Sequence, residues 1–258
     1  MRIVRVDRDG PRFGVLESDL ETVSLLQDDP FGDQGVVRSG ERVDLSASRI
    51  LPPVAPSKIV AVGRNYRAHV QEMGLRSHEV PSVFLKPPQT LVADGGTVVL
   101  PPDSLTTHVE HEAELAIVIG RPARHARARD AWDHIFGFTC ANDVSARDVQ
   151  RSDPQLTRGK GFDTFCPLGP WVTTDLDPAD LAVTTTVNGE LRQAGRTSQL
   201  MRGVDELVAH VSQAMTLLPG DVILTGTPAG VGPLVVGDEV SVTIEGIGTL
   251  TNTVVARG

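Results

Sequence analysis

The segment from His111 to Ile119 places two carboxylates where they could do chemistry. Its run of branched apolar residues is typical of a strand. Side chains of a strand alternate between two faces, so Glu112 and Glu114 share one face, which Ala116 and Val118 continue. Two neighbouring carboxylates in apolar surroundings raise each other's pKa unless a cation binds between them. The opposite face is that of a protein core: Ala113, Leu115, Ile117 and Ile119.

A third carboxylate follows the next apolar run. Residues Ile135–Ala141 lead directly into Asn142 and Asp143. Glu112, Glu114 and Asp143 would form an all-oxygen site, which suits a hard cation such as Mg²⁺ better than zinc. Two alternatives remain: a solvated strand face for the glutamates, and an N-cap role for Asp143 at a helix over residues 144–149.

A histidine and a glutamate lie on one face of a predicted short helix over residues 65–74, which has Asn65 at its start and Gly74 at its end. His69 and Glu72 are three positions apart and therefore neighbours. As a general base, His69 would take a proton while Glu72 orients its imidazole. A surface ion pair is the alternative. Glycines at both ends of the segment would let it move as a lid.

Other candidates are single residues in segments of unusual composition. Lysine is scarce, with 3 lysines against 21 arginines, and Lys160 lies between two glycines. A mobile surface loop is its alternative interpretation. Arg147 and Gln150 closely follow Asp143, and ordinary residues of a helix surface are the alternative interpretation for both. The segment 225–232 lacks the Gly-Lys-Ser/Thr ending of a phosphate-binding loop, so a tight turn that offers N–H groups and Thr227 to a carboxylate fits better.

The elements that must position these residues are mostly strands. Residues 1 to about 50 indicate short strands, and the proline-rich segment 51–57 is the predicted boundary between a small N-terminal domain (1–57) and a larger domain (58–258). Asn188-Gly189 predicts a hairpin turn, and apolar residues from Val204 to Leu218 predict one amphipathic helix. This pattern predicts an α+β fold.

Composition excludes several classes of protein. At 258 residues, with 40% hydrophobic and 22% charged residues, the chain resembles ordinary globular proteins. Its formal net charge of −9 argues against nucleic acid or an anionic membrane as the main partner. We expect no signal peptide and no membrane span. The two cysteines, Cys140 and Cys166, have no metal-binding or redox spacing, which favours reduced thiols and a cytoplasmic location.

Taken together, the motifs closely resemble those of the fumarylacetoacetate hydrolase family, in the family's order, from about residue 58 to the C-terminus. The matching segments are Val62–Tyr66, His69 to Glu72, Phe84–Pro87, His111–Leu115, Asn142–Asp148, Lys160–Asp163, Val187–Glu190 and Leu224–Pro228.

This resemblance implies a strand-rich catalytic domain, a mixed β-sandwich roll, behind a small N-terminal β-rich domain, and a homodimer. It implies Mg²⁺ or Mn²⁺ held by Glu112, Glu114 and Asp143. It also implies a lid that carries His69 and Glu72. Lys160 would join these two as a catalytic residue. The substrate-binding residues would be Arg64, Lys86, Arg147, Gln150 and Thr227.

The site would suit a small anionic 2-oxo acid. A divalent ion with three carboxylates keeps one net negative charge, so Lys160 and Arg147 would supply the positive charge that an anionic substrate needs. With the keto oxygen polarised, breaking a bond from C3 leaves a pyruvate enolate. We expect hydrolysis of an acylpyruvate or decarboxylation of an oxaloacetate-like acid.

Two alternatives remain open. One is 2-hydroxyhepta-2,4-diene-1,7-dioate isomerase or 5-oxopent-3-ene-1,2,5-tricarboxylate decarboxylase activity in aromatic catabolism. The other is a non-catalytic binding protein that keeps the metal for structure, which would need neither His69 nor Lys160.

Overall fold

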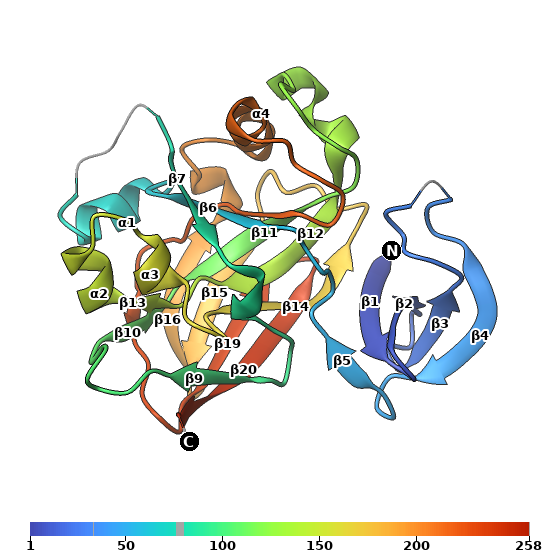
Figure 1. Ribbon diagram of the computed structural model, residues 1–258, viewed down its shortest axis with the longest axis horizontal. Coiled ribbons are helices and arrows are strands. Elements are labelled where there is room, and N and C mark those ends of the chain that lie inside the picture. The colour runs from blue at the N-terminus through green and yellow to red at the C-terminus, as the bar shows by residue number, and fades with distance from the viewer. Residues whose placement is uncertain (33, 76–79, 258) are drawn as a thin grey trace.

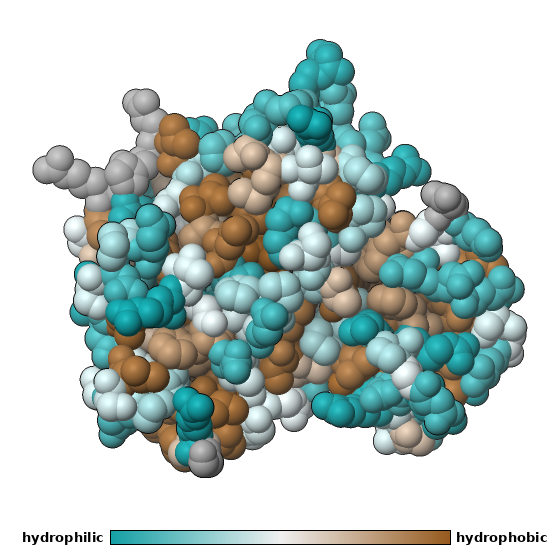
Figure 2. All heavy atoms as spheres, viewed as in Figure 1, coloured by the Kyte–Doolittle hydropathy of each residue, from teal (hydrophilic) through white to brown (hydrophobic). Residues whose placement is uncertain are grey.

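The structure is a computed structural model that describes residues 1–32, 34–75 and 80–257. It is dominated by strands, with short helices at the periphery and one longer helix, as the predicted α+β class requires (Figure 1). Hydrophilic and apolar residues are interspersed over both the N-terminal strands and the rest of the molecule on the face in Figure 2. No helix among the described residues is long and apolar enough to cross a membrane.

One large mixed sheet runs through the molecule. Two of its strands lie off the main order: β5 (Arg49–Leu51) pairs with β1 (Arg2–Asp7), and β8 (Leu91–Val92) pairs in parallel with β14 (Cys166–Thr173). β17 and β6 also pair in parallel. The strands in spatial order are β4 (Arg38–Asp44), β3 (Thr22–Leu26), β2 (Pro11–Leu16), β1 (Arg2–Asp7), β14 (Cys166–Thr173), β12 (Ile135–Asn142), β11 (Ala113–Ile119), β17 (Val222–Leu224), β6 (Ile59–Gly63) and β7 (Ser82–Lys86).

Two smaller sheets complete the strand architecture. The predicted hairpin is confirmed, since Asn188 and Gly189 connect β15 to β16 with φ angles of 53° and 79°. The five-stranded sheet has the order β16 (Glu190–Arg196), β15 (Ala182–Val187), β19 (Glu239–Ile244), β20 (Gly248–Ala256) and β9 (Thr97–Leu100). The three-stranded sheet has the order β13 (Ser145–Ala146), β10 (Val109–His111) and β18 (Gly232–Pro233).

The core lies on both faces of β11. Leu115 and Ile117 pack in one cluster with Val183 and Val242 of the five-stranded sheet, which makes this region a sandwich of two mixed sheets. The other face of β11 contributes Ala116 and Val118 to a second buried cluster. The predicted alternation is therefore confirmed, and β11 is buried along its whole length.

The helices are short except for one. α4 (Val204–Ala214) confirms the predicted amphipathic helix, but it ends earlier than the apolar row suggested, because Leu217 pairs with Ala123 as an isolated bridge and Leu218 is exposed. The α-helices are α1 (Arg67–Glu72), α2 (Arg147–Ser152), α3 (Thr157–Lys160) and α4 (Val204–Ala214). The 3₁₀ helices are η1 (Pro88–Thr90), η2 (Ala128–His134) and η3 (Thr197–Gln199).

The N-terminal strands extend the large sheet. β1 pairs antiparallel with β14, with Arg2 opposite Thr173 and Ile3 opposite Val172. The first strands are thus bonded directly to the strands of the larger part, as Figure 1 shows at β1. The division of the chain at residues 51–57 stays a prediction.

The strand predicted from His111 to Ile119 is interrupted at Glu112. β10 ends at His111 in the three-stranded sheet, and β11 begins at Ala113 in the large sheet. The N–H of Glu112 donates to the side-chain oxygen of Asn142 at 2.9 Å, and its carbonyl accepts from the N–H of Asp143 at 2.8 Å. The single-strand prediction was wrong at this point because a side chain replaces one ladder bond where the chain changes sheets.

Asp221, which is fully buried, connects the starts of β6 and β17, and the loops after these strands carry site residues. One of its oxygens accepts from the N–H of Ser57 at 3.0 Å and of Lys58 at 3.1 Å, and the other from the N–H of Leu218 at 2.7 Å.

Asp221→Ala would leave these donors without their partner and should lower the free energy of unfolding by about 3 kcal/mol or more in urea denaturation. The exposed Asp133→Ala is the matched control and should change it by less than about 0.5 kcal/mol. Equal effects of the two substitutions would contradict the role given to Asp221.

Candidate active site

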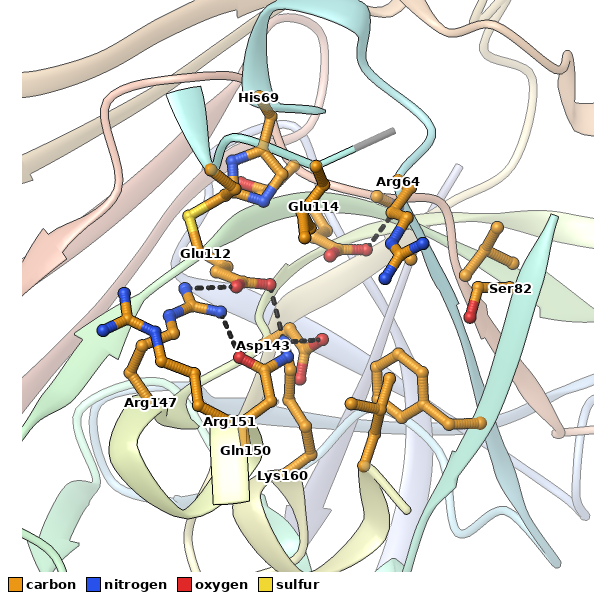
Figure 3. A pocket seen from close by; sticks show the side chains of 18 residues that line it. Arg64, His69, Ser82, Glu112, Glu114, Asp143, Arg147, Gln150, Arg151 and Lys160 are labelled. Atoms are coloured by element: carbon orange, nitrogen blue, oxygen red, sulfur yellow. Dashed lines mark hydrogen bonds and ion pairs between the residues drawn. The ribbon is translucent and has the colours of Figure 1, made fainter. Parts of the chain in front are cut away.

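A cavity of about 330 Å³ brings most of the candidate residues together (Figure 3). Two candidates, Glu72 and Lys86, lie outside its lining and contact residues that line it. Its lining includes Arg64, His69, Glu112, Glu114, Asp143, Arg147, Gln150, Lys160 and Thr227.

The three carboxylates meet because β11 and β12 pair in one register. Ala113 lies opposite Asn142, so the residues just beyond them, Glu112 and Asp143, also lie opposite one another. Glu114 is two residues along β11. One oxygen from each of the three carboxylates lies within 4.8 Å of the others, and all three side chains are buried. Asp143 does not cap α2, whose N-cap is Ala146, so that alternative was wrong.

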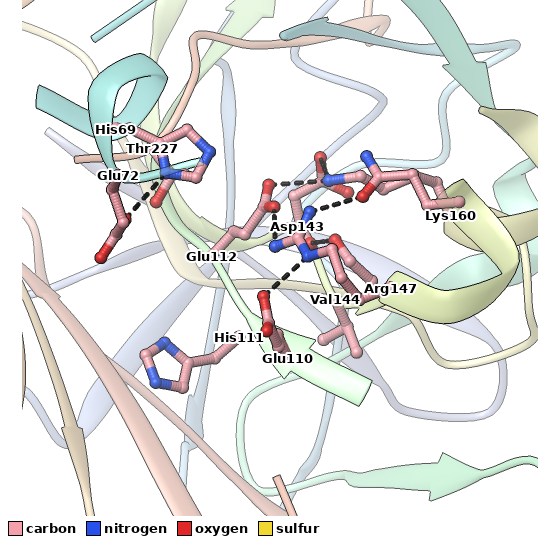
Figure 4. A network of polar contacts seen from close by, with 12 residues as sticks. His69, Glu72, Glu110, His111, Glu112, Asp143, Val144, Arg147, Lys160 and Thr227 are labelled. Atoms are coloured by element: carbon pink, nitrogen blue, oxygen red, sulfur yellow. Dashed lines mark hydrogen bonds and ion pairs between the residues drawn. The ribbon is translucent and has the colours of Figure 1, made fainter. Parts of the chain in front are cut away.

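Cations from three separate segments surround these carboxylates. The ammonium of Lys160 donates to Glu112 at 2.7 Å and to Asp143 at 2.8 Å. Lys86, on β7, donates to the other oxygen of Asp143 at 2.6 Å. Arg147, at the start of α2, donates to Glu112 at 2.6 Å (Figure 4). Lys160 is therefore a buried partner of the acidic residues, and the surface-loop alternative for it was wrong.

The carboxylates differ in how far neighbouring positive charges offset their negative charge. Burial alone would raise the pKa of Glu112, but Lys160 and Arg147 outweigh it and hold that pKa well below its usual range. For Glu114, burial and then the charges of Asp143 and Glu112 raise the pKa well above its usual range. Its carboxylate accepts a hydrogen bond from the N–H of Gly226, and no ion pair to Glu114 forms among the residues that the structure describes.

These residues fit a hard divalent cation. The donor set is three buried carboxylates that can each offer an oxygen to one point, as Mg²⁺ and Mn²⁺ prefer. Glu114 supplies the second argument, since it is a buried carboxylate that forms no ion pair with any of the described residues and whose pKa is raised by burial and by its acidic neighbours. A bound cation would remove that cost. Glu112, Glu114 and Asp143 are thus the residues that would hold it.

His69 and Glu72 form a hydrogen-bonded pair at the edge of the cavity. The Nδ1 atom of His69 lies 3.2 Å from a carboxylate oxygen of Glu72, whose other oxygen accepts from the N–H of Gly230 at 2.9 Å. Because a carboxylate only accepts, Nδ1 carries the proton and Nε2 is left as the basic nitrogen. Figure 4 shows Nε2 on the side of the ring where Glu112 lies. The pair can therefore act as an oriented base, and His69 is buried, unlike a surface ion pair.

The substrate-binding predictions divide into two groups. Arg64, Gln150 and Thr227 line the cavity. The fully buried Lys86 does not line it; its ammonium donates to Asp143 and to the carbonyl of Val144, so it supports a metal-ligand candidate instead of facing a substrate.

Arg147 lines the cavity but already donates to three protein groups. Besides Glu112, it bonds the carboxylate of Glu110 at 2.7 Å and the amide oxygen of Gln150 at 2.6 Å. Its guanidinium thus orients the Gln150 side chain, whose amide nitrogen remains as the group to offer a ligand. Glu110 had no signal in the sequence, because its partner is 37 residues away along the chain.

Gln193 is a second residue that the sequence did not reveal. Its amide oxygen accepts from the N–H of Ala113 at 3.0 Å and the hydroxyl of Thr185 at 2.9 Å, so its amide nitrogen is the donor to Thr227 Oγ1 at 2.7 Å. Because Thr227 Oγ1 accepts this bond, its own hydroxyl proton is free to be donated into the cavity. Only the folded arrangement of β16 with the loop after β17 exposes this role.

The loop after β17 offers its N–H groups to carboxylates, as the turn prediction suggested, and the carboxylates seen here are the protein's own. Gly226 donates to Glu114 and Gly230 to Glu72. Gly226 has a φ of 101°, and a Cβ there would lie 2.9 Å from the Cβ of Asn65. Glycine is therefore required for this close approach.

The chain belongs to the fumarylacetoacetate hydrolase family. Residues 58–255 match the family model described as fumarylacetoacetate (FAA) hydrolase C-terminal, and residues 1–53 match that described as Rv2993c-like, N-terminal. The predicted family and fold are confirmed.

Its relatives are enzymes with different reactions. The crystal structure of 5-carboxymethyl-2-hydroxymuconate delta-isomerase from Mycobacterium smegmatis is 49% identical over 100% of both chains, with a TM-score of 0.92. Human mitochondrial oxaloacetate tautomerase FAHD2A is 45% identical over 80% of this chain and 69% of its own. Maleylpyruvate hydrolase from Sphingobium sp. SYK-6, solved with manganese(II) and pyruvate, is 32% identical over 100% of both chains, with a TM-score of 0.82. These similarities support an enzyme over a non-catalytic binding protein.

Glu114→Gln separates a metal site from a merely structural acidic cluster. In the metal-free protein it removes a carboxyl group whose ionisation burial and the charges of Asp143 and Glu112 oppose, and with which no cation of the described residues forms an ion pair, so this protein should melt at the same or a higher temperature. The affinity for Mn²⁺, measured by titration calorimetry, should fall by roughly 100-fold because an oxygen ligand is lost.

Asp163→Asn, at an exposed acidic position near Lys160, is the matched control and should leave the Mn²⁺ affinity within about twofold. Unchanged Mn²⁺ binding in Glu114→Gln would show that this carboxylate is no ligand.

Proposed function

We propose that this chain is a divalent-metal-dependent enzyme that moves a proton to and from C3 of a small anionic 2-oxo acid. The observation that carries the proposal is the orientation of His69, whose Nδ1 is held by Glu72 while Nε2 is left toward the acidic residues. The names of two relatives, an isomerase and a tautomerase, support proton transfer as the reaction.

The metal would be held by Glu112, Glu114 and Asp143, and when bound it supplies a Lewis acid that polarises the keto oxygen of the substrate. The chain's own residues then handle the proton. His69 Nε2 accepts it from C3, and Glu72 stabilises the imidazolium that results. Delivery of the proton to another carbon gives isomerisation, and delivery to the oxygen on C2 gives the enol tautomer. In the reverse direction His69 takes the proton from the enol oxygen and delivers it to C3, which gives the keto tautomer.

The remaining polar groups bind and orient the substrate. Thr227 donates its hydroxyl proton and Gln150 its amide protons toward the substrate's oxygens, because their acceptor atoms are already bonded to Gln193 and Arg147. Burial would lower the pKa of Lys160, but Asp143 and Glu112 outweigh it and raise that pKa, so Lys160 stays charged. Lys160 therefore acts by its positive charge beside the developing enolate.

Cleavage of a C–C bond is the second candidate, and it is the reaction expected from the sequence alone. The relative solved with manganese(II) and pyruvate is a maleylpyruvate hydrolase, which supports it at a lower identity. The same enolate would form when an acyl group or CO₂ leaves C3 of the substrate. Hydrolysis would also need His69 to activate water, whereas loss of CO₂ needs no base to begin.

His69→Gln tests the proton transfer. The ketonisation of oxaloacetate enol, followed by its ultraviolet absorbance with Mg²⁺ present, should slow by roughly 10² to 10⁴-fold, because the base is lost. Glu72→Gln should cause a smaller loss of the same kind, and Mn²⁺ affinity should stay within about twofold in both variants. His210→Gln, on α4, is the control and should retain the wild-type rate. Wild-type rates in His69→Gln would end this assignment.

Cleavage is tested by the release of pyruvate from acetylpyruvate and from oxaloacetate, with Mg²⁺ and then with excess chelator. If the chain also cleaves, His69→Ala should abolish hydrolysis of acetylpyruvate and leave decarboxylation of oxaloacetate partly intact, because only hydrolysis needs an activated water. Equal loss of both activities would contradict these roles. No pyruvate from either acid would leave proton transfer as the activity.

Two predictions, one about the assembly and one about the ligand, remain proposals. We propose a homodimer on the basis of the family resemblance, and a small anionic acid as the ligand on the basis of the cations that line the cavity.

A further inference from the structure

Arg64 is a cation in the cavity that no residue in the described part of the chain binds. It is half-buried and lines the cavity, yet it forms no hydrogen bond or ion pair with the residues that the structure describes. The other buried cations of the site differ from it, since Lys160 and Arg147 each bond two carboxylates. A half-buried guanidinium without a partner is available to a ligand.

The backbone of Arg64 is held in a conformation that disfavours its own side chain. Its φ is 64°, in the left-handed region where a residue with a Cβ is strained. The neighbouring Asn65 fixes this turn, because its side chain donates to the carbonyl of Thr225 at 2.8 Å and accepts from the N–H of Arg202 at 2.9 Å. Strain that the surrounding structure enforces at a cavity is characteristic of functional positions.

The charge of the cavity calls for more than one negative group on the ligand. Among the described residues, four cationic side chains line it against three carboxylates, which leaves these groups with one net positive formal charge before any divalent cation adds two more. Figure 3 shows the Arg64 side chain on the Glu114 side of the acidic residues, away from Arg147. A ligand held at the carboxylates and reaching toward Arg64 would carry a charge at each end.

We propose that Arg64 is a specificity-determining residue that binds the second carboxylate of a 2-oxo diacid. A guanidinium can donate two parallel hydrogen bonds to a carboxylate, and this geometry recognises the group as well as its charge. The inference rests on the proposed function for the other end of the ligand, the 2-oxo acid group. It adds the class of substrate, a diacid in preference to a monoacid.

Arg151 provides the comparison within the same cavity. It also lines the cavity and forms no ion pair with the described residues, but its side chain is exposed on α2. Water and salt screen a charge in that position. The same substitution at both positions therefore separates a specific contact made by Arg64 from the long-range electrostatic effect of any arginine in the cavity.

The test measures binding, so it does not depend on turnover. Calorimetry with Mn²⁺ present compares matched acids in which a methyl group replaces the second carboxylate: oxaloacetate with 2-oxobutanoate, and 2-oxoglutarate with 2-oxopentanoate. The wild-type protein should prefer the diacid in at least one pair. Arg64→Gln should reduce that preference by roughly 10- to 100-fold, the loss of a charge-assisted contact. Its affinity for the monoacid should change by less than about threefold.

Arg64→Gly is the second variant, and it tests the strain. Glycine adopts a positive φ without a clash, so this variant should lose the preference as Arg64→Gln does while its melting temperature rises. A lower melting temperature would overturn the strained-position argument. Arg151→Gln is the charge-matched control and should keep the preference within about twofold.

Three results would overturn the inference: equal loss of both acids in Arg64→Gln, the same loss of preference in Arg151→Gln, or no preference in the wild-type protein. Failure of the proposed function is distinguishable from these. Absent enol turnover together with a preference that depends on Arg64 would overturn the catalytic proposal and support the diacid site.

Discussion

The site depends on one electrostatic constraint, the cost of burying three carboxylates together. One oxygen of each lies within 4.8 Å of the others, away from water. An unpaired buried charge is expensive, and like charges at this distance repel strongly. The fold meets most of this cost with Lys160, Lys86 and Arg147, whereas the described part of the chain gives Glu114 one backbone N–H and no paired cation. The cluster is therefore balanced except at one carboxylate, which is where a metal ion contributes most.

This constraint explains why the site needs so many separate segments. Glu114 is on β11, Glu112 just before it and Asp143 just after β12, whereas their cations come from β7, α2 and α3. A lysine next to a carboxylate on the same strand could not reach it, because neighbouring side chains point to opposite faces. Cations must arrive from other elements, and the large sheet, with β7 at its edge, provides that arrangement.

The sequence could predict the parts of the site that local rules control. Strand alternation predicted that Glu112 and Glu114 share a face, and helical spacing predicted that His69 and Glu72 are neighbours; the structure brings each pair together as expected. The family and fold followed from motifs over most of the chain. The interruption at Glu112 could not be predicted, because it depends on a bond from the side chain of Asn142, 30 residues later.

Roles that depend on long-range contacts were the ones missed or misassigned. Lys86 was predicted to face a substrate because a motif contains it, but its partner Asp143 is 57 residues away and only the fold shows that they bond. Gln193 had no signal, although it determines which atom of Thr227 is free. A sequence shows which donors and acceptors exist, whereas the free ones are known only when every bond is assigned.

Some polar groups of the cavity already bond other groups of the protein, and others remain free for a ligand. This difference helps to explain how one fold supports several reactions. Relatives with TM-scores of 0.92 and 0.82 bear the names of an isomerase and a hydrolase, so the backbone alone does not decide the reaction. In this chain the acidic residues and the cations bonded to them are tied to one another, and changing one would leave others unpaired in the interior. Groups with few such ties, Arg64 and Arg151 among them, can change at little cost to the fold. Selection for a new substrate would therefore act first on the outer lining of the cavity and leave the buried charges as they are.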